Sequence, residues 1–437
     1  MTGDLSESAP SRAATRRGIR ASYTPRHQER RSRWQAVGLP VLRITAASLA
    51  VVLVSGVSVA SFAIWQLGAK VSDNAVDISN GKEEPVAPPP ALGAFEGGFN
   101  ILAVGADNSA VQGEEYGDRG SAILNDVNMI FHVAADHKSA VVLSLPRDLV
   151  IPHPECVDPA TQEKFGAMSA QPLNDAFARG GLGCVRSTVE KLTGLSIPYA
   201  ATFTFAGTVA MSDAVGGVPI CLDTAVNDPA SGLDLPAGTS VVSGQQALSY
   251  LRSREGVGDG SDLSRISSQQ AYMSSLMRVM KSSQTLTDVS KVLNLANAAA
   301  ENVSLSQSLA NLTTMASMAL TLKDLDLEKL VFVQYPNLPD PDNRYKIIPN
   351  RELANRLIEK IQADQPFALD QSALGAEVTI DPNAPITEAP LPDAAVDAPP
   401  PAETVAPTNP TDGAPEILEG LRGQTANQQT CSVAYHY

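Results

Sequence analysis

Short apolar runs alternate with amphipathic stretches through the middle of the chain. The runs are bounded by glycine, proline or other turn residues and predict buried strands at 99–105, 127–133, 140–145, 200–205, 218–222 and 330–335. Capping-box sequences predict one helix from Ser187 to Gly194 and the start of another at Ser243. Helical spacing predicts a helix that ends before Gly216, one that includes Ile266 to Met280, further helices within 284–325, and a last helix over 352–363. This alternation indicates an α/β (α+β layered) fold, a central mixed sheet flanked by helices, in one domain over about residues 97–367.

The two ends of the chain lack this periodicity. Residues 1–43 are rich in arginine, serine and alanine, and we predict that they are disordered. Residues 70–96 have the composition of a stiff, proline-rich linker. From residue 368 to 437 proline, alanine and acidic residues dominate, which predicts a disordered acidic tail.

A charge-free apolar segment, residues 44–69, lies between the basic end and the linker. As a helix it would measure roughly 39 Å at about 1.5 Å per residue, more than the hydrocarbon core of a bilayer at about 30 Å. A signal peptide would have a shorter apolar region and a small-residue cleavage site, so we favour an uncleaved transmembrane helix. The arginines before it and the single Lys70 after it predict a single-pass plasma-membrane protein with a cytoplasmic N-terminus and an extracytoplasmic domain.

Charge is distributed unevenly between the basic end and the remainder. The chain has a formal net charge of −15, but residues 1–43 alone contain nine arginines and three acids. The part that follows is therefore more acidic than the total suggests. An acidic domain argues against nucleic acid as a partner.

Four cysteines, Cys156, Cys184, Cys221 and Cys431, occur without any C-x-x-C spacing, which disfavours a metal site or thioredoxin-type chemistry. Disulfides are expected in an oxidising compartment such as the outer side of the membrane. Four cysteines allow three pairings. We favour Cys156–Cys184, which would close a short loop, and this leaves Cys221–Cys431 as the second pair.

One stretch concentrates positive charge within the acidic domain. Arg252 and Arg254 would share a face of an extended segment, and Arg265 and Gln269, four residues apart, would share a face of a helix. A guanidinium group can bind two phosphate oxygens at once, in a bidentate arrangement, and it stays charged at any working pH. The stretch therefore predicts an anionic ligand such as a phosphate or diphosphate. A solvated helix face with surface ion pairs is an equally weighted alternative on these residues alone.

Three aspartates, Asp107, Asp126 and Asp148, lie at the ends of predicted strands. Loops at strand ends are where α/β sheets place their sites. Mg²⁺ uses one or two carboxylates together with phosphate oxygens and waters, so these acids suit it, although aspartates at such positions are also common turn formers. The sequence contains no Ser-His-Asp order, Walker loop or dinucleotide fingerprint.

Several ordered blocks of sequence resemble those of the LytR-CpsA-Psr family. They are NILAVGAD from Asn100, DVNMI from Asp126, SLPRD from Ser144, LNDAF from Leu173 with Gly180-Gly181, DAVGGV from Asp213, ALSYLRSR from Ala247 and DLSRISSQQ from Asp262. The similarity covers about residues 97–285 and extends more loosely to Pro366. The paired cysteines and the Pro/Ala-rich end look like the actinobacterial branch of the family.

The resemblance implies a membrane-anchored phosphotransferase that moves a glycopolymer, as its sugar phosphate, from a polyprenyl diphosphate lipid to peptidoglycan or, in some members, to a protein. By position it implies that Asp107 and Asp126 hold Mg²⁺ or Mn²⁺. It also assigns diphosphate binding to Arg147, Arg252, Arg254, Arg265 and Gln269, with Arg119 as a further candidate. Arg147 and Arg265 would support catalysis by neutralising charge, and Asp262 or Asp148 would accept the proton of the attacking hydroxyl.

This chain departs from the family pattern at two positions. Ser264 stands where the family commonly has glycine, and Ser268 where it often has arginine. Neither change removes a predicted ligand. Among the family's polymers we favour arabinogalactan. The alternatives are a polyprenyl-diphosphate pyrophosphatase that uses water as the acceptor and a non-catalytic envelope protein that binds or regulates.

Overall fold

In the computed structural model, the described residues are 39–82, 90, 95–107, 124–281, 289–375, 377–384 and 415–435. The chain divides into two compact units, residues 1–63 and 64–437. Helix α1, Leu39–Asp73, begins in the first unit, ends in the second and includes the predicted membrane segment. Within the described ranges, no helix meets the length and apolarity needed for a bilayer crossing.

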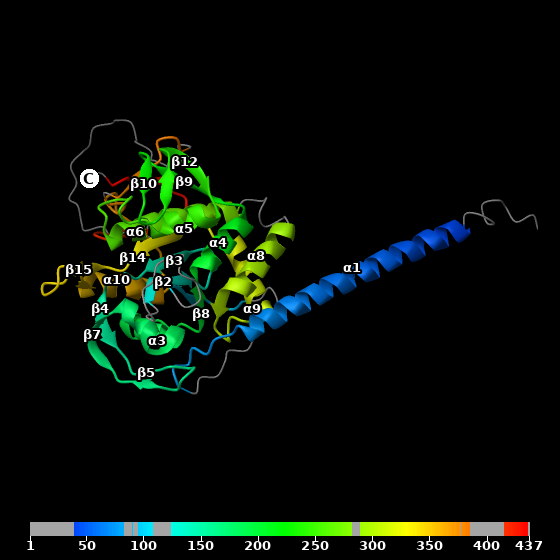
Figure 1. The fold of residues 1–437 in the computed structure, drawn as a ribbon, viewed down its shortest axis with the longest axis horizontal. Helices are drawn as coiled ribbons and strands as arrows, with labels where there is room; N and C mark the ends of the chain where they lie inside the picture. Colours follow the sequence, from blue (N-terminus) through cyan, green and yellow to red (C-terminus); the bar gives the residue numbers. More distant parts are fainter. Residues whose placement is uncertain are drawn as a thin grey trace, which may run out of the picture. The chain divides into compact units, whose positions relative to one another are not determined.

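A seven-stranded mixed sheet forms the centre of the second unit, in the order β13-β8-β1-β2-β3-β14-β20 (Figure 1). The strands are β1 (Phe99–Asp107), β2 (Leu124–Val133), β3 (Ala140–Ser144), β8 (Tyr199–Phe203), β13 (Val303–Leu305), β14 (Leu330–Gln334) and β20 (Gly423–Thr425). Strand β2 is antiparallel to both β1 and β3, whereas β8 is parallel to β1 and β14 is parallel to β3. The predicted mixed sheet is confirmed.

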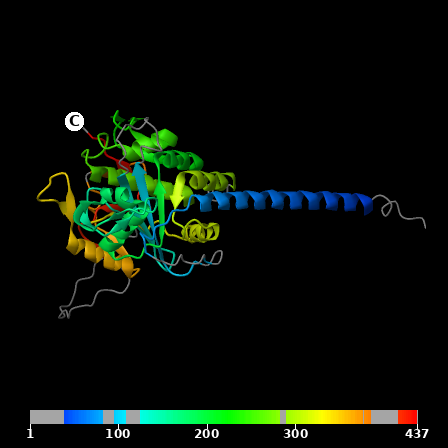
Figure 2. The same ribbon diagram turned by 60° about the horizontal axis from the view of Figure 1, so that its bottom comes forward.

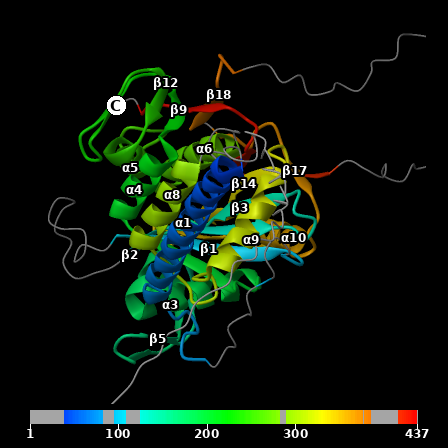
Figure 3. The ribbon, with the colours of Figure 1, turned by 90° about the vertical axis from the view of Figure 1, so that its right-hand side faces the viewer.

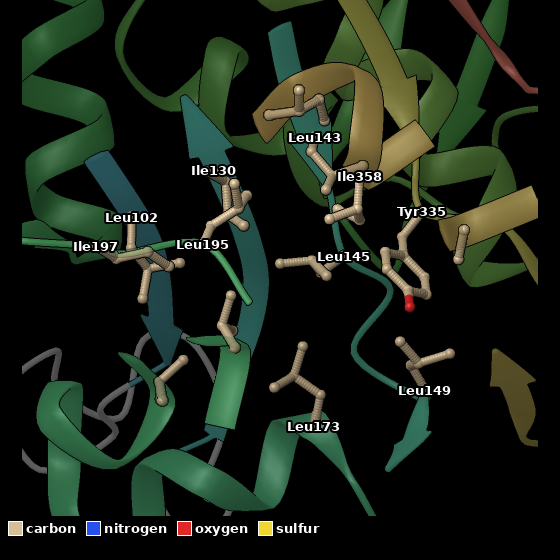
Figure 4. Close-up of a cluster of buried hydrophobic side chains, with 14 of the residues drawn as sticks. Leu102, Ile130, Leu143, Leu145, Leu149, Leu173, Leu195, Ile197, Tyr335 and Ile358 are labelled. Atoms are coloured by element: carbon tan, nitrogen blue, oxygen red, sulfur yellow. The ribbon is translucent and has the colours of Figure 1, made fainter. Parts of the chain in front are cut away.

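Alternate side chains of these strands enter two cores, one on each face of the sheet. In β1, Leu102 packs in the first core and Phe99 in the second; in β14, Val333 and Phe332 divide in the same way. Figure 4 shows the first core, to which α10 contributes Ile358. Helices α3 and α10 cover this core, while α8 and α9 cover the other (Figures 2 and 3).

The helices of the second unit begin and end close to several predicted positions. They are α3 (Ala176–Thr193), α4 (Phe205–Val215), α5 (Gly244–Arg252), α6 (Asp262–Lys281), α8 (Val289–Asn302), α9 (Leu312–Lys323) and α10 (Arg351–Gln362). The capping-box prediction at Ser187 is wrong, because α3 already begins at Ala176 and Ser187 lies inside it, accepting a hydrogen bond from Asn80. Gly194, with φ of 66°, ends this helix as predicted.

A second, four-stranded sheet has the order β12-β9-β21-β18 and packs beside α5 and α6 (Figure 1). Its strands are β9 (Val218–Leu222), β12 (Gly238–Val242), β18 (Val378–Ile380) and β21 (Thr430–Ser432). Two-stranded pairs complete the unit: β4 (Val150–His153) with β7 (Met168–Pro172), β5 (Cys156–Val157) with β6 (Lys164–Phe165), β10 (Val226–Asp228) with β11 (Leu233–Leu235), β15 (Asn337–Pro339) with β16 (Ile347–Pro349), and β17 (Phe367–Leu369) with β19 (Glu416–Leu418).

The predicted disordered tail is wrong for most of its described residues. Strand β20 extends the central sheet beside β14, and β21 lies between β9 and β18. A few apolar side chains, Leu418, Leu421 and Ala426, are each buried against the domain, so a composition low in apolar residues still yields packed strands. Residues 385–414, which carry much of the Pro/Ala-rich sequence, lie outside the described residues.

Both predicted disulfides are present. Cys156 and Cys184 join β5 to α3, with sulfur atoms 1.94 Å apart, and Cys221 and Cys431 join β9 to β21, with sulfur atoms 1.96 Å apart. The second bond links positions 210 residues apart and fixes β21 to the body of the domain.

The burial of His153 makes stability depend on pH. His153 of β4 is fully buried, and burial, reinforced by the charge of Arg179, lowers its pKa to about 4. The folded state therefore favours the neutral imidazole, and stability should fall as the pH drops from about 6.5 towards 4, by roughly 3 kcal/mol. Urea unfolding between pH 7.5 and 4.5 should show a flatter pH dependence for His153→Leu, and parallel curves would contradict this assignment.

Candidate active site

A β-bulge places Asp126 at the edge of the site. In the β1–β2 pair, Ala106 faces Asn125 and Gly105 faces Val127, so Asp126 is the extra residue between two paired positions. A bulge of this kind turns a side chain away from the regular alternation of the strand. The backbone of Asp107 ends β1 nearby, opposite Leu124. The side chain of Asp107 and the whole of Arg119 lie outside the described residues.

Arg147 follows β3 and connects three aspartates. Its Nη1 donates to Asp126 Oδ1 at 2.7 Å, while its Nε lies 3.1 Å from Asp262 Oδ1 and 3.5 Å from Asp148 Oδ2. Asp148 also forms an ion pair with Lys346, with Nζ 2.6 Å from Oδ1. Two of the three predicted strand-end acids, Asp126 and Asp148, therefore meet at one guanidinium.

Arg265 approaches the same acids from helix α6. Its Nη2 donates to the Asp126 carbonyl oxygen at 2.9 Å and lies 2.7 Å from Asp262 Oδ1. Arg254 Nε is 3.8 Å from the same carboxylate oxygen. The Arg265 side chain is only 5% exposed, whereas that of Arg254 is 32% exposed. Asp262 is thus contacted by three guanidinium groups, one of which is partly open to solvent.

The loop between Arg254 and Asp262 has a compact turn that the sequence encodes locally. Gly258 and Gly260 adopt φ of 61° and 79°, a region that side chains rarely enter. Ser264 is completely buried, and its Oγ accepts a hydrogen bond from the Asp259 N–H at 3.1 Å and contacts the Asp259 carboxylate. The serine that stands in place of the family's glycine therefore helps to fix the start of α6.

The charges within the cluster shift one another's pKa values. Burial would raise the pKa of Asp126, but Arg147 and Arg265 outweigh burial and hold it below its usual range. Burial would lower the pKa of Arg147, yet Asp262 and Asp126 raise it. For Arg254 and Arg265, burial is the largest effect and lowers the pKa, but guanidinium groups remain protonated in proteins.

Two predicted ligands have other described contacts. Arg252 is the last residue of α5, so the proposed extended face shared with Arg254 is wrong, and its guanidinium lies over the Phe205 ring, 4.5 Å from the centroid. Gln269 is buried, and its Nε2 donates to the Leu251 carbonyl oxygen at 3.1 Å. These contacts connect α5 to its neighbours α4 and α6.

Lys346, which forms the ion pair with Asp148, is not among the residues predicted for the site. It directly precedes β16 and is 198 positions from its partner. No local pattern marks this lysine. A search for basic residues after Tyr335, where the similarity to the family becomes looser, could have proposed it.

The family model described as LytR_cpsA_psr matches residues 63–361. This chain belongs to the LytR_cpsA_psr family. The match includes Asp126, Arg147, Arg254, Asp262 and Arg265, and the family prediction is confirmed.

Relatives of this LytR_cpsA_psr chain include the cell wall biosynthesis protein LcpA of Corynebacterium glutamicum, 32% identical over 61% of this chain and 55% of that protein. The probable cell wall biosynthesis protein LcpB of the same organism is 32% identical over 46% of each chain. This chain therefore spans about half the length of these curated relatives. A solved LytR-Csp2A-Psr enzyme from Actinomyces oris is 21% identical, covering 64% of this chain and 96% of that chain, with a TM-score of 0.45.

The carboxylate chemistry of this LytR_cpsA_psr site fits Mg²⁺. Asp126 is ionised at neutral pH and 13% exposed, and a hard cation needs only one or two such ligands beside phosphate oxygens. Elsewhere in the described ranges, Cys221, Cys431 and Asp381 form a group with metal-ligand spacing, but both cysteines are committed to a disulfide. Asp126 is therefore the better candidate ligand.

Proposed function

We propose that this protein is a phosphotransferase that moves a glycopolymer from a polyprenyl diphosphate carrier to peptidoglycan. The observation that carries the proposal is the convergence of Arg147, Arg254 and Arg265 on the buried carboxylate of Asp262. A protein named as a polyisoprenyl-teichoic acid–peptidoglycan teichoic acid transferase, TagT of Bacillus subtilis, supports the reaction class; it is 22% identical over 74% of this chain and 94% of its own length.

The guanidinium groups would act on the charge of the diphosphate. The acceptor hydroxyl oxygen forms a bond to the phosphorus that bears the sugar, and the bond from that phosphorus to the bridging oxygen breaks. Polyprenyl phosphate leaves with the electron pair. Arg254, the most exposed of the three arginines, would meet the incoming diphosphate, while Arg147 and Arg265 neutralise the charge that develops on the leaving group.

A carboxylate is needed to accept the proton of the attacking hydroxyl. The Asp262 carboxylate is already contacted by three guanidinium groups, with Oδ1 lying 3.1 Å from Arg147, 3.8 Å from Arg254 and 2.7 Å from Arg265, so it is poorly placed to meet an acceptor hydroxyl. Asp148 has one close partner, Lys346, a longer contact of 3.5 Å with Arg147, and a side chain that is 21% exposed. We therefore propose that Asp148 accepts the proton and that Asp262 holds the three arginines in position.

The proposal includes a divalent cation. Asp126, together with Asp107, would hold Mg²⁺ or Mn²⁺. When bound, the cation would add positive charge beside the diphosphate oxygens. The described cluster needs this addition, because three arginines and Lys346 face the carboxylates of Asp126, Asp148 and Asp262 and are largely neutralised by them.

The proposal also places the protein at the plasma membrane. The basic residues 1–43, the charge-free segment 44–69 and the two disulfides support a single-pass anchor with the second unit outside the cell. The donor would then be a polyprenyl-diphosphate-linked glycan and the acceptor peptidoglycan, with no nucleic acid as partner. We propose arabinogalactan as the polymer. The two Corynebacterium glutamicum relatives are named as a cell wall biosynthesis protein and a probable one, which supports a cell-wall glycan.

The deciding experiment follows the donor's fate with and without its acceptor. The full chain in detergent is incubated with a polyprenyl-diphosphate-linked glycan, in Mg²⁺ or EDTA, with and without peptidoglycan. We expect the glycan to become attached to peptidoglycan in Mg²⁺ and not in EDTA. Cleavage that proceeds equally without peptidoglycan would instead indicate a pyrophosphatase, and tight donor binding without turnover would indicate a binding or regulatory protein.

A further inference from the structure

Residues 430–435 reach the loop that carries the arginine site. The Gly258 N–H donates to the Val433 carbonyl oxygen at 2.7 Å, and the Tyr435 N–H donates to the Gly256 carbonyl oxygen at 3.1 Å. Between them, Val257 and Ala434 form an isolated antiparallel bridge. Residues 256–258 lie in the loop between Arg254 and Asp262. Residues 433–435, which are distant in the sequence, therefore pair with the backbone of the loop that connects these two site residues.

Ser432 connects the two helices on either side of that loop. Its Oγ lies 2.6 Å from the Tyr250 hydroxyl and 3.2 Å from Ser268 Oγ. Tyr250 is in α5, two residues before Arg252, and Ser268 is in α6, three residues after Arg265. Tyr250 and Ser432 are completely buried and Ser268 is 1% exposed, so water cannot replace these hydrogen bonds.

Ser268 is the position where the family often has arginine. In this chain a small hydroxyl at that position leaves room for a partner, and Ser432 supplies it. Another described bond between α5 and α6 runs from Gln269 to the Leu251 carbonyl oxygen. Both connections add to the apolar packing between the two helices, in which the Tyr250 and Tyr272 ring centroids lie 6.3 Å apart.

Arg265 is on α6 and Arg254 lies two residues after the end of α5, so the relative position of the two helices bears on where both guanidinium groups lie. Arg265 Nη2 is 2.7 Å and Arg254 Nε is 3.8 Å from the same Asp262 oxygen. A diphosphate contacted by both guanidinium groups requires that this relative position be kept, because a displacement of about 1 Å at a positioned group lowers its effect sharply. The disulfide between Cys221 and Cys431 fixes the segment that begins one residue before Ser432.

We propose that Ser432, with the backbone of residues 433–435, is a positioning element of the diphosphate site. It holds α5, the intervening loop and α6 at the spacing in which Arg254 and Arg265 bind one diphosphate together. This inference rests on the proposed function, since it assumes a diphosphate ligand. Ser432 touches no reacting atom, and its effect passes through the two helices.

The test compares Ser432→Ala with Thr430→Ala in the full chain. Thr430 is on the same strand, is buried and donates to Gln424 Oε1 at 3.0 Å, so its replacement also removes a buried hydrogen bond from β21. Binding of geranyl diphosphate in Mg²⁺ is measured by calorimetry, with thermal unfolding in parallel. We expect Ser432→Ala to weaken binding about fivefold to tenfold and Thr430→Ala to leave it within about twofold.

A double-mutant cycle separates positioning from general destabilisation. Tyr250→Phe removes the other hydroxyl, and the double variant with Ser432→Ala removes both members of the pair, while Ser268 Oγ loses its contact with Ser432 as it does in Ser432→Ala alone. If the pair acts as one unit, the double variant binds geranyl diphosphate no more weakly than the worse single variant. Additive losses, or equal losses in Ser432→Ala and Thr430→Ala, would overturn the inference. Wild type that fails to bind geranyl diphosphate would overturn the proposed function and this inference with it.

Discussion

Arg265→Ala is expected to lower glycan transfer by about 100-fold or more, which is the usual loss when one preorganised donor to a developing anion is removed. The Arg265 side chain is 5% exposed and is held by the Asp262 carboxylate and the Asp126 carbonyl oxygen. A guanidinium held in this way needs little reorganisation when charge develops on the leaving phosphate. Both kcat and KM should be measured, because the ground-state diphosphate carries charge as well.

Arg278 provides the matched control for this variant. It lies on the same helix, and its Nη1 donates to the carbonyl oxygens of Ala426 and Gln428 rather than to the acids of the site. Arg278→Ala should therefore change thermal stability but leave kcat within about twofold. Arg265→Lys keeps the charge without the planar fork and should recover only part of the lost activity. Equal turnover in Arg265→Ala and wild type would exclude Arg265 from the mechanism.

The central sheet and the main helices were predictable because their sequences follow simple periods. Strands β1 and β14 are short apolar runs with alternate residues in different cores, and α10 begins within one residue of the predicted position. Asp126 and Arg265 were also predictable from the residues, since Asp126 lies at a strand end and Arg265 on one helix face with Gln269, whereas Arg147 was predicted only from the family resemblance. Their convergence, however, was implied by resemblance and became a geometrical fact only in the structure.

The remaining parts depend on contacts between distant residues. The ion pair of Lys346 with Asp148 has no local signal in the sequence. The same holds for the contact of Arg252, the last residue of α5, with the ring of Phe205. Residues 415–435 read as part of an acidic tail because their composition is polar. Their strands form by pairing with β14 and β9, which composition cannot anticipate.

Asp262→Ala is expected to destabilise the fold by about 3–5 kcal/mol, the usual cost of removing one partner from a buried ion pair. Asp262 is 13% exposed and contacts the guanidinium groups of Arg147, Arg254 and Arg265, which would then repel one another in a poorly solvated site. Urea unfolding at neutral pH should show the loss. Asp234, an exposed acid on β11, is the control, and Asp234→Ala should change stability by less than about 0.5 kcal/mol.

Inorganic diphosphate should restore much of this lost stability, because its negative charge can take the place of the missing carboxylate among the three arginines. A ligand that binds only the folded state raises stability with concentration according to its dissociation constant, so tighter binding appears as a larger shift in Tm. We therefore expect diphosphate to raise the Tm of Asp262→Ala more than that of wild type. If Asp262 instead served mainly as the proton acceptor, Asp262→Ala would abolish transfer, but diphosphate would raise its Tm no more than that of wild type. A variant as stable as wild type and indifferent to diphosphate would show that Asp262 does not hold the arginines in place.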